Sequence, residues 1–183
     1  MSRHQLHICT IGGHQHGKTA VTRALLERWN PRERAVAHAG VLRSYYFSFE
    51  TDCQKYQVCD LGAPYIPKHL VTGGWELDGA IVVVSAAEGV TPEVEKQIRL
   101  ARFGGVPAII PFLNKCDLVS HAQGIDLSRR GIVDLLQSYR YRIGEPSVVL
   151  GACLGGDGRS ALFGNAVQRL SDLMDREFRS RYA

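Results

Sequence analysis

The sequence predicts an α/β fold in which helices cover both faces of a mostly parallel sheet. Strand-like and helix-like segments alternate from one end of the 183-residue chain to the other. The segment 80–84 is continuously apolar, as a central parallel strand is, and 108–113 is expected to be the next buried strand. A glycine-rich loop, Gly12–Thr19, joins the first strand-like run to a helical pattern. This length suits one core, so we expect a single domain over residues 1–183.

The glycine-rich loop fits the pattern G-x-x-x-x-G-K-[ST] and comes after a strand expected over 6–11. In such a loop successive main-chain N–H groups point inward at an anion, and the helix N-terminus adds its positive end. We expect Lys18 to reach the β- and γ-phosphates of a nucleotide and the Thr19 hydroxyl to bind Mg²⁺. The alternative is a plain turn before a helix, which the complete strand, loop and helix context disfavours. The residues expected to hold the phosphates are Gly12, His14, Gln15, His16, Gly17, Lys18, Thr19 and Ala20.

Each further element is predicted from a local pattern. Aromatic residues at every second position from Tyr45 to Phe49 indicate a strand, and the turn at Thr51-Asp52 makes it half of a hairpin at one sheet edge. Thr91 before Pro92 is typical of a helix start. The expected elements are a helix over 18–29, an irregular segment over 30–41, the hairpin strands over 45–49 and 55–61, a short helix over 67–75, a strand over 80–84, a helix over 92–103, a strand over 108–113, a helix over 128–139, a strand over 148–150 and a closing helix with the apolar stripe Phe163, Val167, Leu170 and Met174.

Composition argues against several classes of protein. No apolar run reaches the roughly 18 residues that a membrane helix needs, and the start of the chain shows no signal-peptide pattern. The net charge of +4 is modest and the basic residues are scattered, so we expect neither DNA nor a membrane as a partner. The five cysteines are odd in number and lack C-x-x-C spacing, which favours reduced thiols in a cytoplasmic protein.

A second motif, N-K-x-D at Asn114-Lys115-Cys116-Asp117, comes directly after the strand over 108–113. An aspartate at its end can accept hydrogen bonds from guanine N1–H and the 2-amino group, and adenine has neither donor there. We expect Asn114 to tie this loop to the glycine-rich loop over residues 12–19, called the phosphate loop below. We expect the Lys115 stem to cover one face of the base. Alone, the motif is weak, and a polar turn is the alternative. Its place after a buried strand makes guanine the expected base.

The order of these motifs resembles the GTP-binding domain family of bacterial elongation factor Tu, in the translation-factor branch of P-loop GTPases. The resemblance covers nearly the whole chain and rests on residues 12–19, 60, 78–84, 105–110, 112–117 and 151–154. It implies a three-layer α/β/α P-loop NTPase fold, with a six-stranded, mostly parallel sheet and one antiparallel edge strand. It also implies GTP or GDP as ligand, with Mg²⁺ held by Thr19 and, through water, by Asp60. The family's guanine-contacting S-A-L motif corresponds to Ala152, Cys153 and Leu154.

Three positions depart from the family pattern where hydrolysis and switching are concerned. Leu42 stands where the family has a Mg²⁺-binding threonine, with Ser44 as the nearest hydroxyl that could replace it. Ala63 replaces a glycine whose N–H meets the γ-phosphate, and Pro64 replaces the histidine that positions the attacking water. No catalytic residue is therefore assigned. We expect impaired hydrolysis and less discrimination between diphosphate and triphosphate. Neutral drift is the alternative explanation of these changes.

The sequence is compatible with several functions. The first is a guanine-nucleotide-binding protein with weak or absent GTP hydrolysis, acting as a regulator or decoy toward a protein partner of unknown identity. The second is an active GTPase in which His69, His16 or a partner supplies the missing group. The third is an interaction module with an empty site, and a nucleotide kinase is less favoured because no lid segment is evident. We do not expect tRNA as a partner, because residues 1–183 lack the β-barrel domains that hold it in the family.

Overall fold

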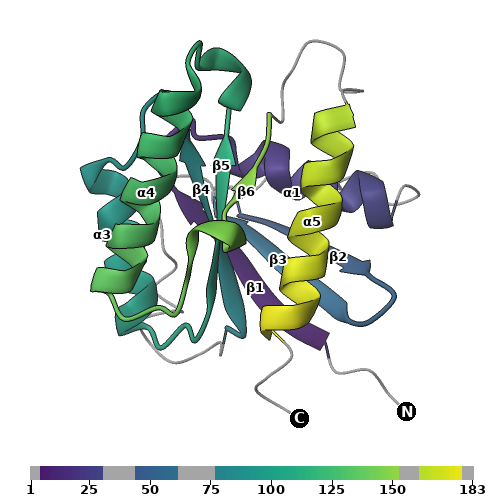
Figure 1. Cartoon of the computed structure of the whole chain (residues 1–183). Helices are drawn as coiled ribbons and strands as arrows, with labels where there is room; N and C mark the ends of the chain where they lie inside the picture. The colour runs from purple at the N-terminus through teal and green to yellow at the C-terminus, as the bar shows by residue number, and fades with distance from the viewer. Residues whose placement is uncertain (1–4, 31–43, 62–76, 153–160, 179–183) are drawn as a thin grey trace.

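The computed structural model describes residues 5–30, 44–61, 77–152 and 161–178, which form a central sheet between two layers of helices (Figure 1). The strands are β1 (Gln5–Gly12), β2 (Ser44–Glu50), β3 (Lys55–Leu61), β4 (Gly79–Ser85), β5 (Ile109–Asn114) and β6 (Val149–Leu150). The helices are α1 (Lys18–Trp29), α3 (Pro92–Phe103), α4 (Ala122–Ser138) and α5 (Ala161–Glu177), with short 3₁₀ helices η1 (Cys116–Leu118) and η2 (Glu145–Ser147).

The six strands form one mixed sheet in the order β2-β3-β1-β4-β5-β6. β1 pairs in parallel with β3 and with β4, and the pairs β4–β5 and β5–β6 are also parallel. β2 and β3 pair antiparallel, so their hairpin forms one edge of the sheet. The α/β class, the six strands and the antiparallel edge predicted from the sequence are all confirmed.

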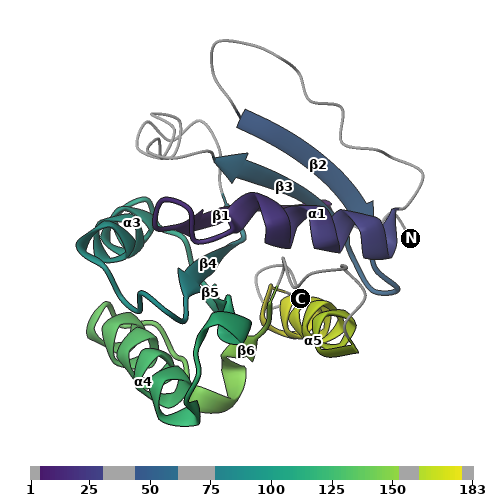
Figure 2. The same cartoon turned by 90° about the horizontal axis from the view of Figure 1, so that it is seen from above.

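Side chains on the two faces of the sheet form two separate cores. Ile8 of β1 lies in the core with Leu25 of α1, whereas its neighbour Cys9 lies in the other core with Ile98 of α3. Successive residues of a strand point to opposite faces, so one apolar strand serves both cores. Figure 2 shows the result, with α3 and α4 on one side of the sheet and α1 and α5 on the other.

The parallel strands also bring the candidate site together. β1, β3, β4 and β5 run in the same direction, so their carboxyl ends meet at one edge of the sheet. Thr10 lies beside Asp60 in the register, and Ser85 lies beside Asn114. The phosphate loop, Asp60 and the N-K-x-D motif therefore gather at that edge, although they lie far apart in the sequence.

Most element boundaries agree with the predictions, and α4 is the clearest exception. This helix begins at Ala122, six residues before the predicted start at Ser128. Its first turns contain Gly124 and the 75 % exposed Leu127, so no apolar periodicity marks them in the sequence. A Cβ at Gly124 would lie only 2.9 Å from Val119 Cγ1, so close packing accounts for the glycine.

Helix α3 and the apolar stripe of α5 agree with their predicted patterns. The Thr91 hydroxyl accepts from the Val94 N–H at 3.3 Å, which confirms the predicted helix start. The stripe of α5 is buried at Val167, Leu170 and Met174. The expected helix over 67–75, residues 31–41 of the irregular segment and the Phe163 side chain lie outside the described residues.

Composition also led to predictions about membrane-spanning helices and about the state of the cysteines. None of its helices has the length and apolar character needed to cross a membrane. Cys9, Cys53, Cys59 and Cys116 are free thiols, as predicted, and Cys153 lies outside the described residues. Burial raises the pKa of the Cys9 thiol, so this side chain stays protonated within the core.

Candidate nucleotide-binding site

The loop between β1 and α1 curls back on itself through three residues with positive φ. These are Gly12 (φ 138°), Gln15 (φ 57°) and Gly17 (φ 95°). At Gly12 a Cβ would overlap the main-chain oxygen of Val83 on β4, so the loop can leave the sheet here only through a glycine. The curled main chain has the form that cradles phosphate groups in strand-loop-helix motifs.

The Lys18 ammonium lies within this loop, and the residue is only 8 % exposed. Its Nζ donates hydrogen bonds to the main-chain oxygens of Gly12 (3.2 Å) and Gly13 (2.7 Å). Burial lowers the pKa of Lys18, and the negative charges of Glu93 and Asp60 act in the opposite direction. The ammonium is thus held where phosphate oxygens could replace the two carbonyl oxygens.

His16 supports the loop from within the protein. Its side chain is 1 % exposed, and its ring packs so closely on Gly13 that a Cβ there would overlap it. The Nε2 atom lies 3.5 Å from Glu88 Oε2. Burial is the main cause of a lowered His16 pKa, and Lys18 adds to it, whereas Glu88 opposes it. The sequence predicted His16 as a phosphate-binding residue, and the structure shows that its buried ring packs against the loop.

The lowered pKa of His16 predicts a dependence of stability on pH. Because the folded protein binds this proton less readily than the unfolded chain, the contribution of His16 is full above about pH 6.5 and is lost as the pH falls through the folded-state pKa. Denaturant unfolding at about pH 7.5 and about pH 5 should show a larger loss of unfolding free energy in the wild type than in His16→Gln. The exposed His121, changed to glutamine, is the control and should behave as the wild type. Equal losses in wild type and His16→Gln would contradict the prediction.

The N-K-x-D motif, here called the base loop (residues 114–117), is joined directly to the phosphate loop. Asn114 is 1 % exposed, and its Nδ2 donates to the main-chain oxygen of His16 at 2.9 Å. Lys115 adopts a left-handed conformation (φ 58°, ψ 34°), and its Nζ lies 3.7 Å from Glu88 Oε1. Asp117 is exposed at the start of η1. Its carboxylate is therefore open to a ligand at the predicted base position.

The segment after β6 lies against the base loop. The Cys116 N–H donates to the main-chain oxygen of Gly151 at 3.2 Å, and the Gly151 N–H donates to that of Leu113 at 2.9 Å. These bonds bring Ala152, which is half-buried, close to the predicted guanine site. Cys153 and Leu154, the other two residues of this motif, lie outside the described residues.

Thr19 and Asp60 were predicted to hold Mg²⁺, and their chemistry fits this ion. Asp60 is fully buried, and its Oδ1 accepts from Thr10 Oγ1 at 2.9 Å. Its Oδ2 has no hydrogen-bond partner among the described residues, so one buried carboxylate oxygen is left over for a further ligand. No group of three or more His, Cys, Asp or Glu side chains in the described ranges could hold a metal by itself. Mg²⁺ bound with phosphates needs only one or two such protein ligands.

The predicted loss of hydrolysis rests on residues that lie outside the described part of the chain. Leu42, Ala63, Pro64 and His69 lie outside the described residues, and the Ser44 side chain does too, although its main chain begins β2. The expectations attached to these five positions remain predictions.

Two acidic residues at the site were not predicted from the sequence. Glu88, in the turn after β4, lies between the His16 ring and the Lys115 ammonium. Glu93, in the first turn of α3, accepts a hydrogen bond from the main-chain N–H of His14 at 2.9 Å. Neither residue belongs to a motif of the sequence. Their place at the site follows from the position of β4 between β1 and β5, because the carboxyl ends of these three strands reach the same edge of the sheet.

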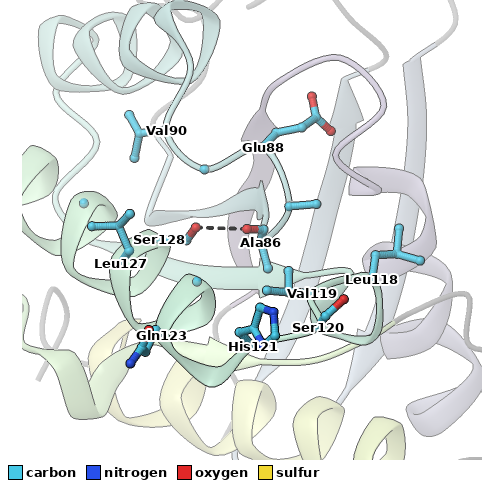
Figure 3. A pocket seen from close by; sticks show the side chains of 14 residues that line it. Ala86, Glu88, Val90, Leu118, Val119, Ser120, His121, Gln123, Leu127 and Ser128 are labelled. Carbon is cyan, nitrogen blue, oxygen red and sulfur yellow. Dashed lines mark hydrogen bonds between the residues drawn. The ribbon is translucent and has the colours of Figure 1, made fainter.

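A surface groove of about 730 Å³ lies beside the base loop (Figure 3). It runs between the turn after β4 and the segment from η1 into α4, where Ser128 Oγ donates to the Ala86 oxygen at 2.9 Å. Val90, Val119 and Leu127 give it a largely apolar lining. This chemistry differs from that of the phosphate loop, where main-chain N–H groups and an ammonium gather.

One comparison with known proteins bears on this arrangement. The family model described as "Elongation factor Tu GTP binding domain" matches residues 46–179. The matched range includes Asp60, the base loop and Ala152, and the phosphate loop lies before it. The family match and the phosphate-loop motif cover different residues, and both indicate a GTP-binding domain.

Proposed function

Because the chain belongs to the elongation factor Tu GTP-binding domain family, we propose that its phosphate loop and base loop bind GDP and GTP, and that it hydrolyses GTP slowly or not at all. Members of this family typically bind these nucleotides with Mg²⁺. A protein that holds a nucleotide without turning it over would act as a regulator or decoy toward a partner that recognises this surface.

The hydrogen bond from Asn114 Nδ2 to the His16 oxygen is the observation that best supports nucleotide binding. It joins the base loop to the phosphate loop, so the proposed carboxylate for guanine and the proposed cradle for phosphates are held near each other before any ligand binds. Such preorganisation favours a ligand that carries both groups, because less ordering is needed when it binds. Lys115 and Asp117 would hold the base, and the loop of residues 12–20 would hold the phosphates.

Slow hydrolysis is proposed from the sequence at two positions. Pro64 occupies the place of the family's water-positioning histidine and has no side-chain donor or acceptor. Leu42 occupies the place of the Mg²⁺-binding threonine, and a hydrocarbon cannot ligate a metal. Orientation of the water and neutralisation of charge are the main contributions a GTPase makes, so both losses act in the same direction.

Titration calorimetry of the full chain with Mg²⁺ and GDP, GTP or ATP tests the proposal. We expect saturable binding of GDP and GTP and at least about 100-fold weaker binding of ATP, because adenine would leave the Asp117 carboxylate unpaired. Equal, weak binding of all three nucleotides would overturn it. Phosphate release from GTP, followed in parallel, separates the two hydrolysis hypotheses. Steady release that disappears in Lys18→Ala would establish an active GTPase instead.

A further inference from the structure

The carboxylate of Glu93, in the first turn of α3, contacts the main chain of the phosphate loop. The main-chain N–H of His14 donates to Glu93 Oε2 at 2.9 Å, across 79 residues of sequence. Main-chain N–H groups of this loop are the donors that phosphate oxygens accept from. One of them is therefore engaged by a negatively charged side chain of the protein.

Glu93 also lies close to Lys18, which indicates the part of the site that it faces. Its charge is the larger of two carboxylate effects that raise the Lys18 pKa, and the charge of Asp60 is the second. In loops of this type the lysine reaches the β- and γ-phosphates. The base loop, by contrast, contacts the phosphate loop at a different residue, through the main-chain oxygen of His16. Glu93 thus lies toward the end of the site where the terminal phosphate of a triphosphate would sit.

We propose that Glu93 is a specificity-determining residue that disfavours nucleoside triphosphate relative to nucleoside diphosphate. The inference rests on the proposed function and concerns the same site. A γ-phosphate needs N–H donors at this end of the loop, and the Glu93 carboxylate competes with it for the His14 N–H. The two groups also repel each other, because both are negatively charged. A diphosphate stops short of this carboxylate and avoids both effects.

The Glu93 side chain can move away from the phosphate loop, so it would weaken the binding of a triphosphate without preventing it. The side chain is half-buried and is anchored by its own helix turn, whose cap is the Thr91 hydroxyl. A triphosphate can bind only when the carboxylate leaves the His14 N–H. The cost of that movement separates the affinities of the two nucleotides.

Glu95 provides a matched control. It lies in the same first turn of α3 and carries the same charge, so Glu95→Gln changes the helix N-terminus in the same way as Glu93→Gln. It is exposed, and its Oε1 accepts from Tyr139 Oη at 3.1 Å, on the side of α4. A general effect of charge on α3 would appear in both variants, and an effect through the phosphate loop only in Glu93→Gln.

The test measures the dissociation constants of GDP and of a β,γ-imido analogue of GTP by calorimetry with Mg²⁺, on the full chain. We expect the ratio of the triphosphate constant to the diphosphate constant to fall about tenfold in Glu93→Ala, the scale of one charge-assisted hydrogen bond. It should fall in the same direction but less in Glu93→Gln, because the amide oxygen can still accept from the His14 N–H. It should stay at the wild-type value in Glu95→Gln. If the Glu93 variants bind both nucleotides with an unchanged ratio, this inference is overturned and the proposed function stands. If the wild type binds neither nucleotide, the proposed function fails and the inference fails with it.

Discussion

Replacement of Asp117 by asparagine is expected to lower the affinity for GDP by at least about 100-fold. Two hydrogen bonds to the carboxylate, each contributing about 1.5–3 kcal/mol when one partner is charged, would be lost or weakened in the variant. ADP, which cannot make these bonds, should bind the variant at least as well as the wild type, because the variant has no carboxylate for adenine to leave unpaired. The preference for GDP over ADP should therefore largely disappear. Calorimetric titration of both nucleotides measures it.

Asp134→Asn is the control for this experiment. Asp134 is exposed on α4, so its replacement removes the same charge away from the base loop. It should leave the preference for GDP over ADP as in the wild type. If Asp117→Asn also kept that preference, guanine would not be recognised at the base loop.

Gly17→Ala is expected to lower the unfolding free energy by about 3 kcal/mol, the largest change of stability that we predict at the site. Gly17 has φ 95°, where an alanine is strained by about 1–2 kcal/mol. In addition, its Cβ would overlap Asn114 Nδ2. The overlap would break the buried hydrogen bond to the His16 oxygen, at a cost of about 1–3 kcal/mol.

Gly105→Ala separates these two effects. Gly105 also has a positive φ, 77°, but a Cβ there would meet no atom within 4 Å. Its replacement should cost only the strain of the main chain. Urea unfolding of both variants gives the difference, which measures the contact between the two loops. Equal destabilisation would mean that Asn114 moves aside without loss.

The sequence was sufficient to predict the fold because its signals are local and agree with one another. The apolar run at 80–84 became the central strand β4, and the alternating aromatic residues at 45–49 became the edge strand β2. The phosphate loop could be recognised because its glycines must stand at fixed positions for the main chain to curl, and in such motifs a lysine follows at a fixed position. The start of α4 could not be predicted, because Gly124 and the exposed Leu127 hide the helical pattern.

The candidate site could be predicted as a set of motifs, together with one of its contacts. Asn114 was expected to tie the two loops together, and its hydrogen bond to His16 does so. Burial of the His16 ring was not foreseen, because it depends on how closely the ring packs on Gly13. The contact between Glu93 and His14 joins residues that are 79 positions apart. A pairing of this kind depends on tertiary packing, so a single sequence gives no local signal for it.

The position of Glu88 couples the phosphate loop to the base loop. Its two carboxylate oxygens face different loops, with Oε2 3.5 Å from His16 Nε2 and Oε1 3.7 Å from Lys115 Nζ. A displacement of the turn that leads into α3 would therefore disturb the contacts of both loops in one movement. The two loops are thus coupled mechanically through a single side chain as well as through the Asn114 hydrogen bond.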